Sequence, residues 1–191
     1  PAKEYGTPDD VQNIPHPIIG YMGTINSTRL DGELLYQIIS QRPDYSFVFT
    51  GPEDDGFRQH RIHSLKNAYF TGQKKVDELP AYITAYDVCI NPQMVNDITD
   101  GNYPLKIDEY LAMGKPTVAT STHTMRHIFA DHTHLATNPE EWLSAIDRAV
   151  TEADDKELAK QRIAFAETHS WGHSVKKIYG IIDNFLKEKA T

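Results

Sequence analysis

The residues that could do chemistry are concentrated in one segment, NYPLKIDEYLAMGKPTVAT, which runs from Asn102 to Thr120. Pro104 suits the first position of a helix, where its missing N–H leaves no hydrogen bond unmade. The amides of Leu105 and Lys106 would then be free at the positive end of the helix dipole, and the Lys106 ammonium adds a full charge. This combination predicts a site for a phosphate group.

A carboxylate follows one helical turn later. Glu109 lies three residues after Lys106, so the two side chains share a helix face, and Glu109 could accept hydrogen bonds from a sugar diol. Gly114 is placed to end the helix, and Pro116 prevents its continuation. The alternative interpretation is an exposed ion pair between Lys106 and Glu109, which is the commoner arrangement when helical spacing alone is considered.

The elements that must position these residues follow a regular alternation. Strands are expected at Ile18 to Met22, Tyr45 to Phe49, Ala68 to Thr71, Asp87 to Ile90, Thr117 to Ala119 and Leu135-Ala136. Helices are expected from Asp31, at Asp77 to Tyr86, Pro104 to Met113, near Met125 to Phe129, and at Glu140 to Glu152, Asp155 to Thr168 and Trp171 to Lys187. Such alternation predicts an α/β fold, a Rossmann-like doubly wound parallel sheet of about six strands with C-terminal helices.

Ligands of such sheets bind beyond the carboxyl ends of the strands. The loops expected there are Gly23 to Leu30, Gly51 to Gly56, Gly72 to Lys75, Asn91 to Tyr103, and Thr120 to Thr124. The phosphate-binding helix start predicted above directly follows the fourth of these loops. Sequence pattern and fold rule therefore indicate the same edge of the sheet.

The composition limits the classes of protein to which the chain could belong. The chain has 191 residues, 39% of them apolar, which is enough for one domain with a core. A net charge of -8 argues against nucleic acid as a partner. The single cysteine, Cys89, excludes an internal disulfide and a Cys-rich zinc site, and fits a reducing cytoplasm. No apolar run approaches the roughly 18–20 residues of a bilayer span, and no signal peptide is expected.

The N-terminal part differs from the rest. Residues 1–16 are polar and rich in proline, and they are expected to form a linker or interdomain arm outside the core, followed by one domain over 17–191. Because the chain starts at Pro1 rather than Met, we expect it to be an excerpt of a longer protein.

Four histidines lie close together in the sequence. They are His123, His127, His132 and His134, and the first two would share a face of a helix. Zinc binding is conceivable, but no Glu-x-x-His arrangement supports it. Surface or capping roles are expected instead, and no metal site.

Together these motifs resemble a known family. The segment from Pro104 resembles the C-terminal-domain signature of the retaining GT-B glycosyltransferases of family 4, the glycosyl transferases group 1. The matching residues are Pro104, Leu105, Lys106, Glu109, Ala112, Gly114 and Pro116, and Ile19 to Gly23, Tyr69 to Gly72 and Leu79 to Val88 resemble the family's earlier segments. The resemblance covers about residues 17 to 187. It implies the C-terminal half of a GT-B fold, which binds the nucleotide sugar, without the N-terminal acceptor domain.

The resemblance also implies roles for individual residues. Glu109 matches the second glutamate of an E-x7-E motif, which binds the ribose hydroxyls. The residues implied at the diphosphate are Gly23, Thr24, Arg29, Pro104, Leu105 and Lys106, and those implied beside the base are Gln73 and Lys74. Lys106, and Arg29 with it, would stabilise the charge that develops on the leaving diphosphate, so no metal cofactor is required.

One position departs from the family pattern. The first glutamate of the motif falls at Gly101, which has no side chain to hold the donor sugar. Asp100 is adjacent and is the expected replacement in the catalytic site, with Asp97 as the alternative. The family's usual Arg and Lys pair after the first strand is not matched either, since Arg29 is the only cation in that loop. Donor-sugar recognition and phosphate neutralisation are thus the parts of the site that the sequence leaves open.

The expected function follows from the resemblance. It is a glycosyltransferase of the hexosyltransferase type, in polysaccharide biosynthesis, that transfers a sugar from a UDP- or GDP-sugar to a glycan or lipid-linked acceptor with retention. The chain alone is expected to be inactive without its missing N-terminal domain. The expected location is the cytoplasm, including the inner face of the membrane, which the missing domain could contact. The alternatives are a GT-B-like nucleotide-sugar epimerase and a non-catalytic nucleotide-sugar-binding module.

Overall fold

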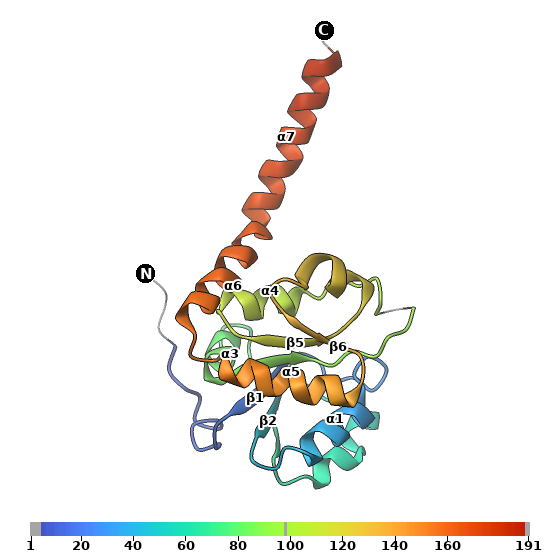
Figure 1. The fold of residues 1–191 in the computed structure, drawn as a ribbon, viewed down its shortest axis with the longest axis vertical. Coiled ribbons are helices and arrows are strands. Elements are labelled where there is room, and N and C mark those ends of the chain that lie inside the picture. The colour runs from blue at the N-terminus through green and yellow to red at the C-terminus, as the bar shows by residue number, and fades with distance from the viewer. Residues whose placement is uncertain (1–4, 98, 190–191) are drawn as a thin grey trace.

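The computed structural model describes residues 5–97 and 99–189 and has one parallel sheet at its centre (Figure 1). The strands are β1 (Ile18–Met22), β2 (Ser46–Thr50), β3 (Ala68–Gly72), β4 (Val88–Asn91), β5 (Thr117–Thr120) and β6 (His134–Ala136). Their order is β3-β2-β1-β4-β5-β6, and every neighbouring pair is parallel. The predicted Rossmann-like sheet of six strands is confirmed.

Helices cover both faces of this sheet. They are α1 (Gly32–Ser40), α2 (Asp55–Arg58), α3 (Leu79–Ala85), α4 (Leu105–Ala112), α5 (Pro139–Thr151), α6 (Lys156–Thr168) and α7 (Trp171–Lys189), with a 3-10 helix at Arg61–Ser64 and a π-helix at Met125–Phe129. Crossover helices alternate with strands because parallel strands cannot be joined by tight turns.

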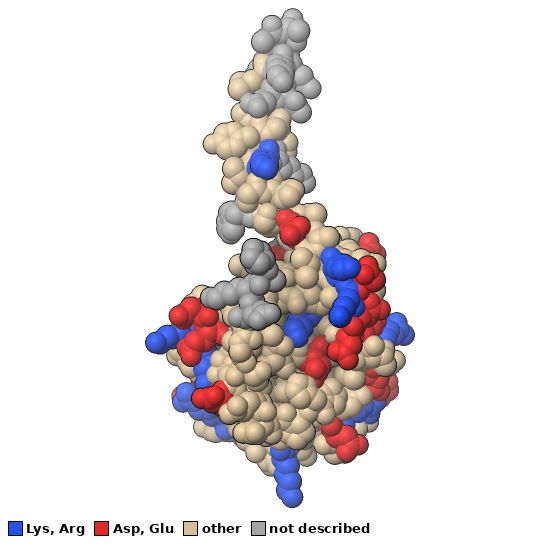
Figure 2. All heavy atoms as spheres, turned by 90° about the vertical axis from the view of Figure 1, so that its left-hand side faces the viewer, with Lys and Arg blue, Asp and Glu red and all other residues tan. Residues whose placement is uncertain are grey.

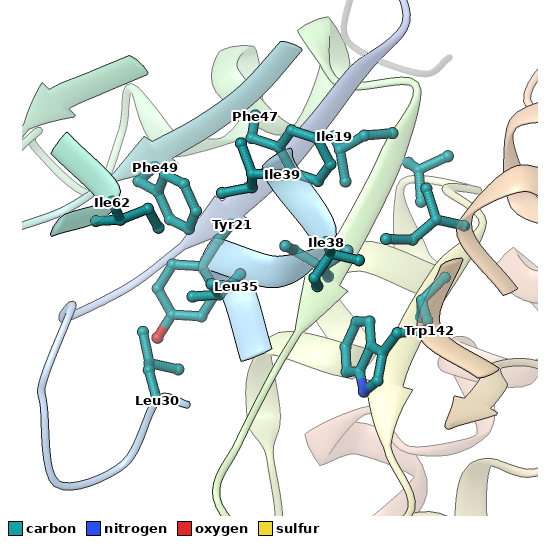
Figure 3. Packing of buried hydrophobic residues seen from close by; sticks show 14 of the residues in the cluster. Ile19, Tyr21, Leu30, Leu35, Ile38, Ile39, Phe47, Phe49, Ile62 and Trp142 are labelled. Atoms are coloured by element: carbon teal, nitrogen blue, oxygen red, sulfur yellow. The ribbon is translucent and has the colours of Figure 1, made fainter. Parts of the chain in front are cut away.

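Alternation along the buried strands divides the core into two layers. Ile19 of β1 packs with Ile38 and Ile39 of α1 and with Trp142 of α5 on one face (Figure 3). Neighbouring strand residues point to the other face, where the side chains of α3, α4 and α6 form the second layer. β1 is buried along its whole length, which is typical of a parallel sheet covered on both sides.

Several of the expected boundaries differ from the observed ones by one or two residues, and those of β2 and α4 have a clear physical reason. Tyr45 lies outside β2, because its N–H bonds Arg42 O in the turn after α1, and β2 extends instead to Thr50. Pro104 is the residue before α4 and not its first helical residue, since its ψ of 85° is not helical. Gly114 has a φ of 72° directly after this helix, as the glycine position predicts.

The arm of residues 5–16 contributes to the core, contrary to the expectation from its composition. Val11 is 1% exposed and packs in the second layer with Ile14 beside it. Asp10 fastens the arm, because its carboxylate accepts hydrogen bonds from Lys74 Nζ at 2.6 Å and from Tyr82 Oη at 2.7 Å. Residues 1–4 of the predicted arm lie outside the described residues.

Helix α7 stands clear of the body in both views (Figure 1, Figure 2). Its described side chains include exposed large apolar residues at helical spacing, namely Val175, Ile178, Tyr179, Ile181, Ile182, Phe185 and Leu186. A run of exposed apolar side chains of this kind is typical of a surface available for interaction. Among the described helices, none has the length and apolar character needed to cross a membrane.

A close approach between β1 and α3 imposes one glycine. A Cβ at Gly20 would lie 2.1 Å from the ring of Tyr86, whose hydroxyl hydrogen-bonds Thr50 Oγ1 at 2.6 Å and so holds the ring in place. We therefore predict that Gly20→Ala lowers the free energy of unfolding by about 1–3 kcal/mol, because the buried ring has little room to move. Urea denaturation measures the change. The control is Gly6→Ala, where a Cβ meets nothing within 4 Å, and an equal loss in both variants would contradict the steric explanation.

Candidate functional site

Three glycine turns end the first three strands at one edge of the sheet. Gly23, Gly51 and Gly72 have φ values of 135°, 148° and 72°, a region that side-chain-bearing residues rarely adopt. The turns touch one another, since a Cβ at Gly51 would lie 2.0 Å from Gly23 O, and Gly51 N donates to Gly72 O at 3.0 Å. The backbone at this edge is therefore compact and comes close to anything bound above it.

A pocket of about 540 Å³ opens at the same edge, between the loops that follow β1 and β4. Its lining consists of Tyr21, Gly23, Thr24, Asn26, Arg29, Leu30, Gln93, Asn102, Tyr103, Pro104, Leu105 and Lys106. The order of the strands reverses between β1 and β4, and open α/β sheets bind their ligands at such a point. A larger cavity of about 700 Å³ lies elsewhere, against α5 and α6, and contains none of the predicted site residues.

Lys106 enters this pocket from the first turn of α4. Its Nζ donates a hydrogen bond to Tyr21 Oη at 2.7 Å and lies 4.1 Å from the centre of the Tyr21 ring. No ion pair joins Lys106 to Glu109, so the alternative of an exposed helical ion pair is wrong for these two described residues. The ammonium instead points across to the end of β1.

The turn after β1 lies directly against that ammonium. A Cβ at Gly23 would lie 2.8 Å from Lys106 Nζ, so the absence of a side chain at Gly23 makes room for the cation. Tyr21 Oη in turn donates to Thr24 O at 3.0 Å and fixes the same turn. The structure thus brings together the sequence-predicted Gly23, Thr24 and Lys106. Gly23 and Thr24 follow β1, whereas Lys106 lies on the helix that follows β4.

The charges in the pocket favour an anion. Burial above all, together with the positive charge of Arg29, lowers the pKa of Lys106 to about 8 against the opposing effect of the Glu109 carboxylate. Two cations therefore share one pocket in a chain whose net charge is -8. Binding a negatively charged group there would relieve the repulsion between them.

Leu105 and Glu109, the other predicted site residues of α4, differ from the expectation in their hydrogen bonding or position. Leu105 N donates to Tyr103 O at 3.1 Å, so this amide is not free, because Pro104 is the cap and the preceding loop folds back on the helix. Glu109 is exposed and does not line the pocket, and burial, the largest influence, raises its pKa. Its place in the site remains a prediction.

The expected catalytic carboxylate, Asp100 in the loop before α4, forms its hydrogen bond outside the pocket. Asp100 Oδ1 accepts a hydrogen bond from His123 N at 2.8 Å, which holds the start of the π-helix, and Asp100 does not line the pocket. Asp97 is exposed, and a Cβ at Gly101 would meet nothing within 4 Å. The structure therefore does not bring Asp100 to Lys106, and its catalytic role remains a prediction.

Gln73 and Lys74 lie at the end of β3, apart from the pocket lining. The Lys74 ammonium binds the Asp10 carboxylate at 2.6 Å, and these contacts with Asp10 and Tyr82 raise its pKa. Composition could not reveal this pairing, because Asp10 comes from the arm. The prediction that both residues border a nucleotide base is not tested by these contacts.

The histidines show two different environments. The rings of His123 and His127 lie 4.2 Å apart, as their spacing predicts, whereas His134 contacts the Glu152 carboxylate at 3.1 Å. Within residues 5–97 and 99–189, no three His, Cys, Asp or Glu side chains converge in a way that could hold a metal ion.

Sequence reasoning missed several pocket residues. Tyr21 had the appearance of an ordinary core residue of a buried strand, and Asn26, Gln93, Asn102 and Tyr103 lie in loops without a motif. Only Asn102 and Tyr103 carried a signal, since they directly precede the helix start that is predicted to bind an anion. Tyr21 could not be found, because its partner Lys106 is 85 residues away in the chain.

The six-stranded parallel sheet, with a cationic pocket at the reversal of its strand order, places the chain in the class of doubly wound α/β domains, which bind their ligands at that point. The family is then given by comparison of sequences. A model described as "Glycosyl transferases group 1" matches residues 16–152. The chain belongs to this glycosyltransferase family.

One curated relative is a Bacillus subtilis (strain 168) protein named as a teichuronic acid biosynthesis glycosyltransferase, TuaH. It is 27% identical over 168 residues, which are 84% of this chain and 42% of the relative. The chain thus spans less than half of that relative's length.

Solved structures with the same fold include sucrose-phosphate synthase from Thermosynechococcus elongatus, with a TM-score of 0.72 and 19% identity over 96% of this chain and 50% of that chain. Anabaena Alr3699/HepE in complex with UDP has a TM-score of 0.72 and 14% identity over 94% of this chain and 54% of that chain. At such identities the likeness concerns the fold, which matches the C-terminal domains of GT-B glycosyltransferases.

The buried ammonium generates a stability prediction. Lys106→Met keeps the length of the side chain and removes a desolvated cation, so we expect the free energy of unfolding at pH 6 to rise by about 1–2 kcal/mol. The unfolded chain binds more protons than the folded chain between about pH 8 and the ordinary lysine pKa of 10.5, so wild-type stability rises over that window. The advantage of the variant should therefore shrink from pH 6 to pH 10.

Urea denaturation at several pH values measures this difference. Lys160→Met is the matched control, because Lys160 forms an exposed ion pair on α6 and its loss should have no such pH dependence. A destabilised Lys106→Met variant, or an advantage independent of pH, would contradict the burial of this charge.

Proposed function

We propose that this chain binds the nucleoside diphosphate sugar donor of a glycosyltransferase. The observation that carries the proposal is the Lys106 ammonium, which lies in the pocket against the Gly23 turn, with Arg29 in the same lining. The negative charge of a diphosphate would be stabilised by two neighbouring cations and by the N-terminus of a helix. Membership of the glycosyl transferases group 1 family supports this choice over other nucleotides.

Lys106 and Arg29 would act most strongly as the reaction proceeds. When the bond between the sugar's anomeric carbon and the diphosphate oxygen breaks, the electron pair stays on that oxygen, and the two cations stabilise the new charge. An acceptor hydroxyl forms the new bond to the anomeric carbon and gives its proton to the departing diphosphate oxygen. We propose retention at this carbon, with the acceptor on a glycan or lipid, a hexose as the transferred sugar, and Asp100 or Asp97 beside it.

We propose UDP rather than GDP as the nucleotide of the donor. The solved relative HepE was studied in complex with UDP, and this supports a UDP-sugar here. The name of the relative TuaH supports a role in polysaccharide biosynthesis. Such donors are used in the cytoplasm, including the inner face of the membrane, and we place the protein there.

A partner domain completes the proposal. The curated relative is more than twice as long as the matched part, and α7 carries exposed apolar side chains such as Ile178, Tyr179 and Ile182. We propose that an N-terminal domain of the same protein covers this helix and binds the acceptor. The chain alone would then bind nucleotide and catalyse no transfer, and turnover by the purified chain without a partner would overturn this part.

A non-catalytic binding module is the second candidate. It is favoured by one observation, namely that Gly101 has no side chain and Asp100 is bonded to His123 N. An activity assay of the longer protein distinguishes the glycosyltransferase from the binding module. Donor-dependent sugar transfer that is lost on Glu109→Ala would exclude the non-catalytic module. Label exchange at C2 of the sugar without an acceptor would instead indicate an epimerase.

Calorimetry with UDP, GDP and ADP tests the binding itself. We expect the wild-type chain to bind UDP more tightly than the others, and Lys106→Met and Glu109→Ala each to weaken UDP binding by about tenfold or more, because each removes a charge-assisted contact. The matched control is Glu157→Ala, an exposed helical carboxylate paired only with Lys160, which should bind as the wild type does. Unchanged affinity in a folded Glu109→Ala variant would refute the ribose assignment.

A further inference from the structure

A carboxylate on α4 joins the donor pocket to the junction of α6 and α7. Tyr103 Oη donates to Asp108 Oδ2 at 2.6 Å, and His169 Nδ1 lies 2.8 Å from the other oxygen, Asp108 Oδ1. Because a carboxylate only accepts, the His169 Nδ1 atom must carry the proton in this contact. One side chain thus holds a residue from each of two distant parts of the chain.

The first of these residues belongs to the pocket. Tyr103 lines it and is 37% exposed, so one part of the ring faces the space where the ligand would lie. Its other side packs against Phe129, with ring centres 5.5 Å apart. Burial, the largest influence, and the Asp108 carboxylate both raise the pKa of the Tyr103 phenol, so the hydroxyl keeps its proton and remains a donor.

The second residue lies at a junction between helices. His169 directly follows α6 and precedes α7 by one residue. Its ring is packed edge-on against Phe165 at 4.5 Å and Phe129 at 5.8 Å between ring centres. The His169 and Asp108 side chains are 24% and 19% exposed, so their contact is partly shielded from water and is stronger than a surface pair.

We propose that Asp108 is a positioning residue, which holds Tyr103 as the wall of the donor pocket and ties that wall to the α6–α7 junction through His169. The proposal rests on the proposed function for the identity of the ligand. It goes further in naming two residues, Asp108 and His169, that act on donor binding without lining the pocket. A displacement of α7 would then change the pocket, because Asp108 is bonded to both sides.

A double-mutant cycle on UDP binding tests the first half of the proposal. We expect Tyr103→Phe and Asp108→Ala each to weaken UDP binding by about three- to tenfold, and the double variant to bind no more weakly than the poorer single variant. This coupling follows if Asp108 acts through the Tyr103 hydroxyl. Additive losses, or unchanged affinity in Asp108→Ala, would overturn the positioning role.

Amide hydrogen exchange without any ligand tests the second half. We expect His169→Ala to speed exchange of the Leu105 amide, which donates to Tyr103 O, by several-fold, because Asp108 loses one of its two partners and Tyr103 loses its edge-on contact with the His169 ring. Lys160→Ala is the control, since it removes an exposed ion pair of α6 and should leave this loop unchanged. If His169→Ala leaves hydrogen exchange in the loop before α4 unchanged, the proposed link between this loop and the α6–α7 junction is overturned.

The two experiments also separate this proposal from the proposed function. A wild-type chain that does not bind UDP refutes the proposed function and with it the role of Asp108 in donor binding. Exchange that does respond to His169→Ala would still support the link between the loop and the junction. A chain that binds UDP but shows additive losses refutes only the positioning role.

Discussion

The reversal of strand order between β1 and β4 is the constraint on which the site depends. Because all six strands are parallel, their carboxyl ends share one edge, and each following loop leaves that edge for one face or the other. The loops after β1 and β4 separate at the reversal, and the pocket opens between them. The start of α4 lies there because the chain reaches α4 from β4, next to the turn that ends β1.

Lys106 illustrates how the fold keeps a charge ready for a ligand. Burial disfavours the ammonium, and its hydrogen-bond partner among the described side chains is the neutral hydroxyl of Tyr21. A carboxylate in that position would neutralise the charge and compete with a phosphate. The fold instead supplies a polar but uncharged acceptor, and leaves the positive charge available to an anion. The cost in stability is local, since the surrounding layers are fully packed.

Much of the fold could be predicted because its signals are local. Buried parallel strands appear as short apolar runs, and the glycines after β1, β2 and β3 indicate the turns that end them. The pocket residues that were predicted lie in segments with a local signal or a family resemblance, namely the turn after β1 and the start of α4. Lys74 and Asp100 show the limit, because their partners, Asp10 and His123, come from segments that no local pattern relates to them.

The sequence by itself determined the alternation of strands and helices, the positions of the turns, the family and the helix start that is predicted to meet a phosphate. These depend on periodicity and on residue types within a few positions of one another. Only the tertiary structure decided that Lys106 turns to Tyr21 rather than Glu109, and that Asp108 joins Tyr103 to His169. The physical reason is that these contacts form between elements far apart in the chain, and the packing of the helices on the sheet sets the distances between them.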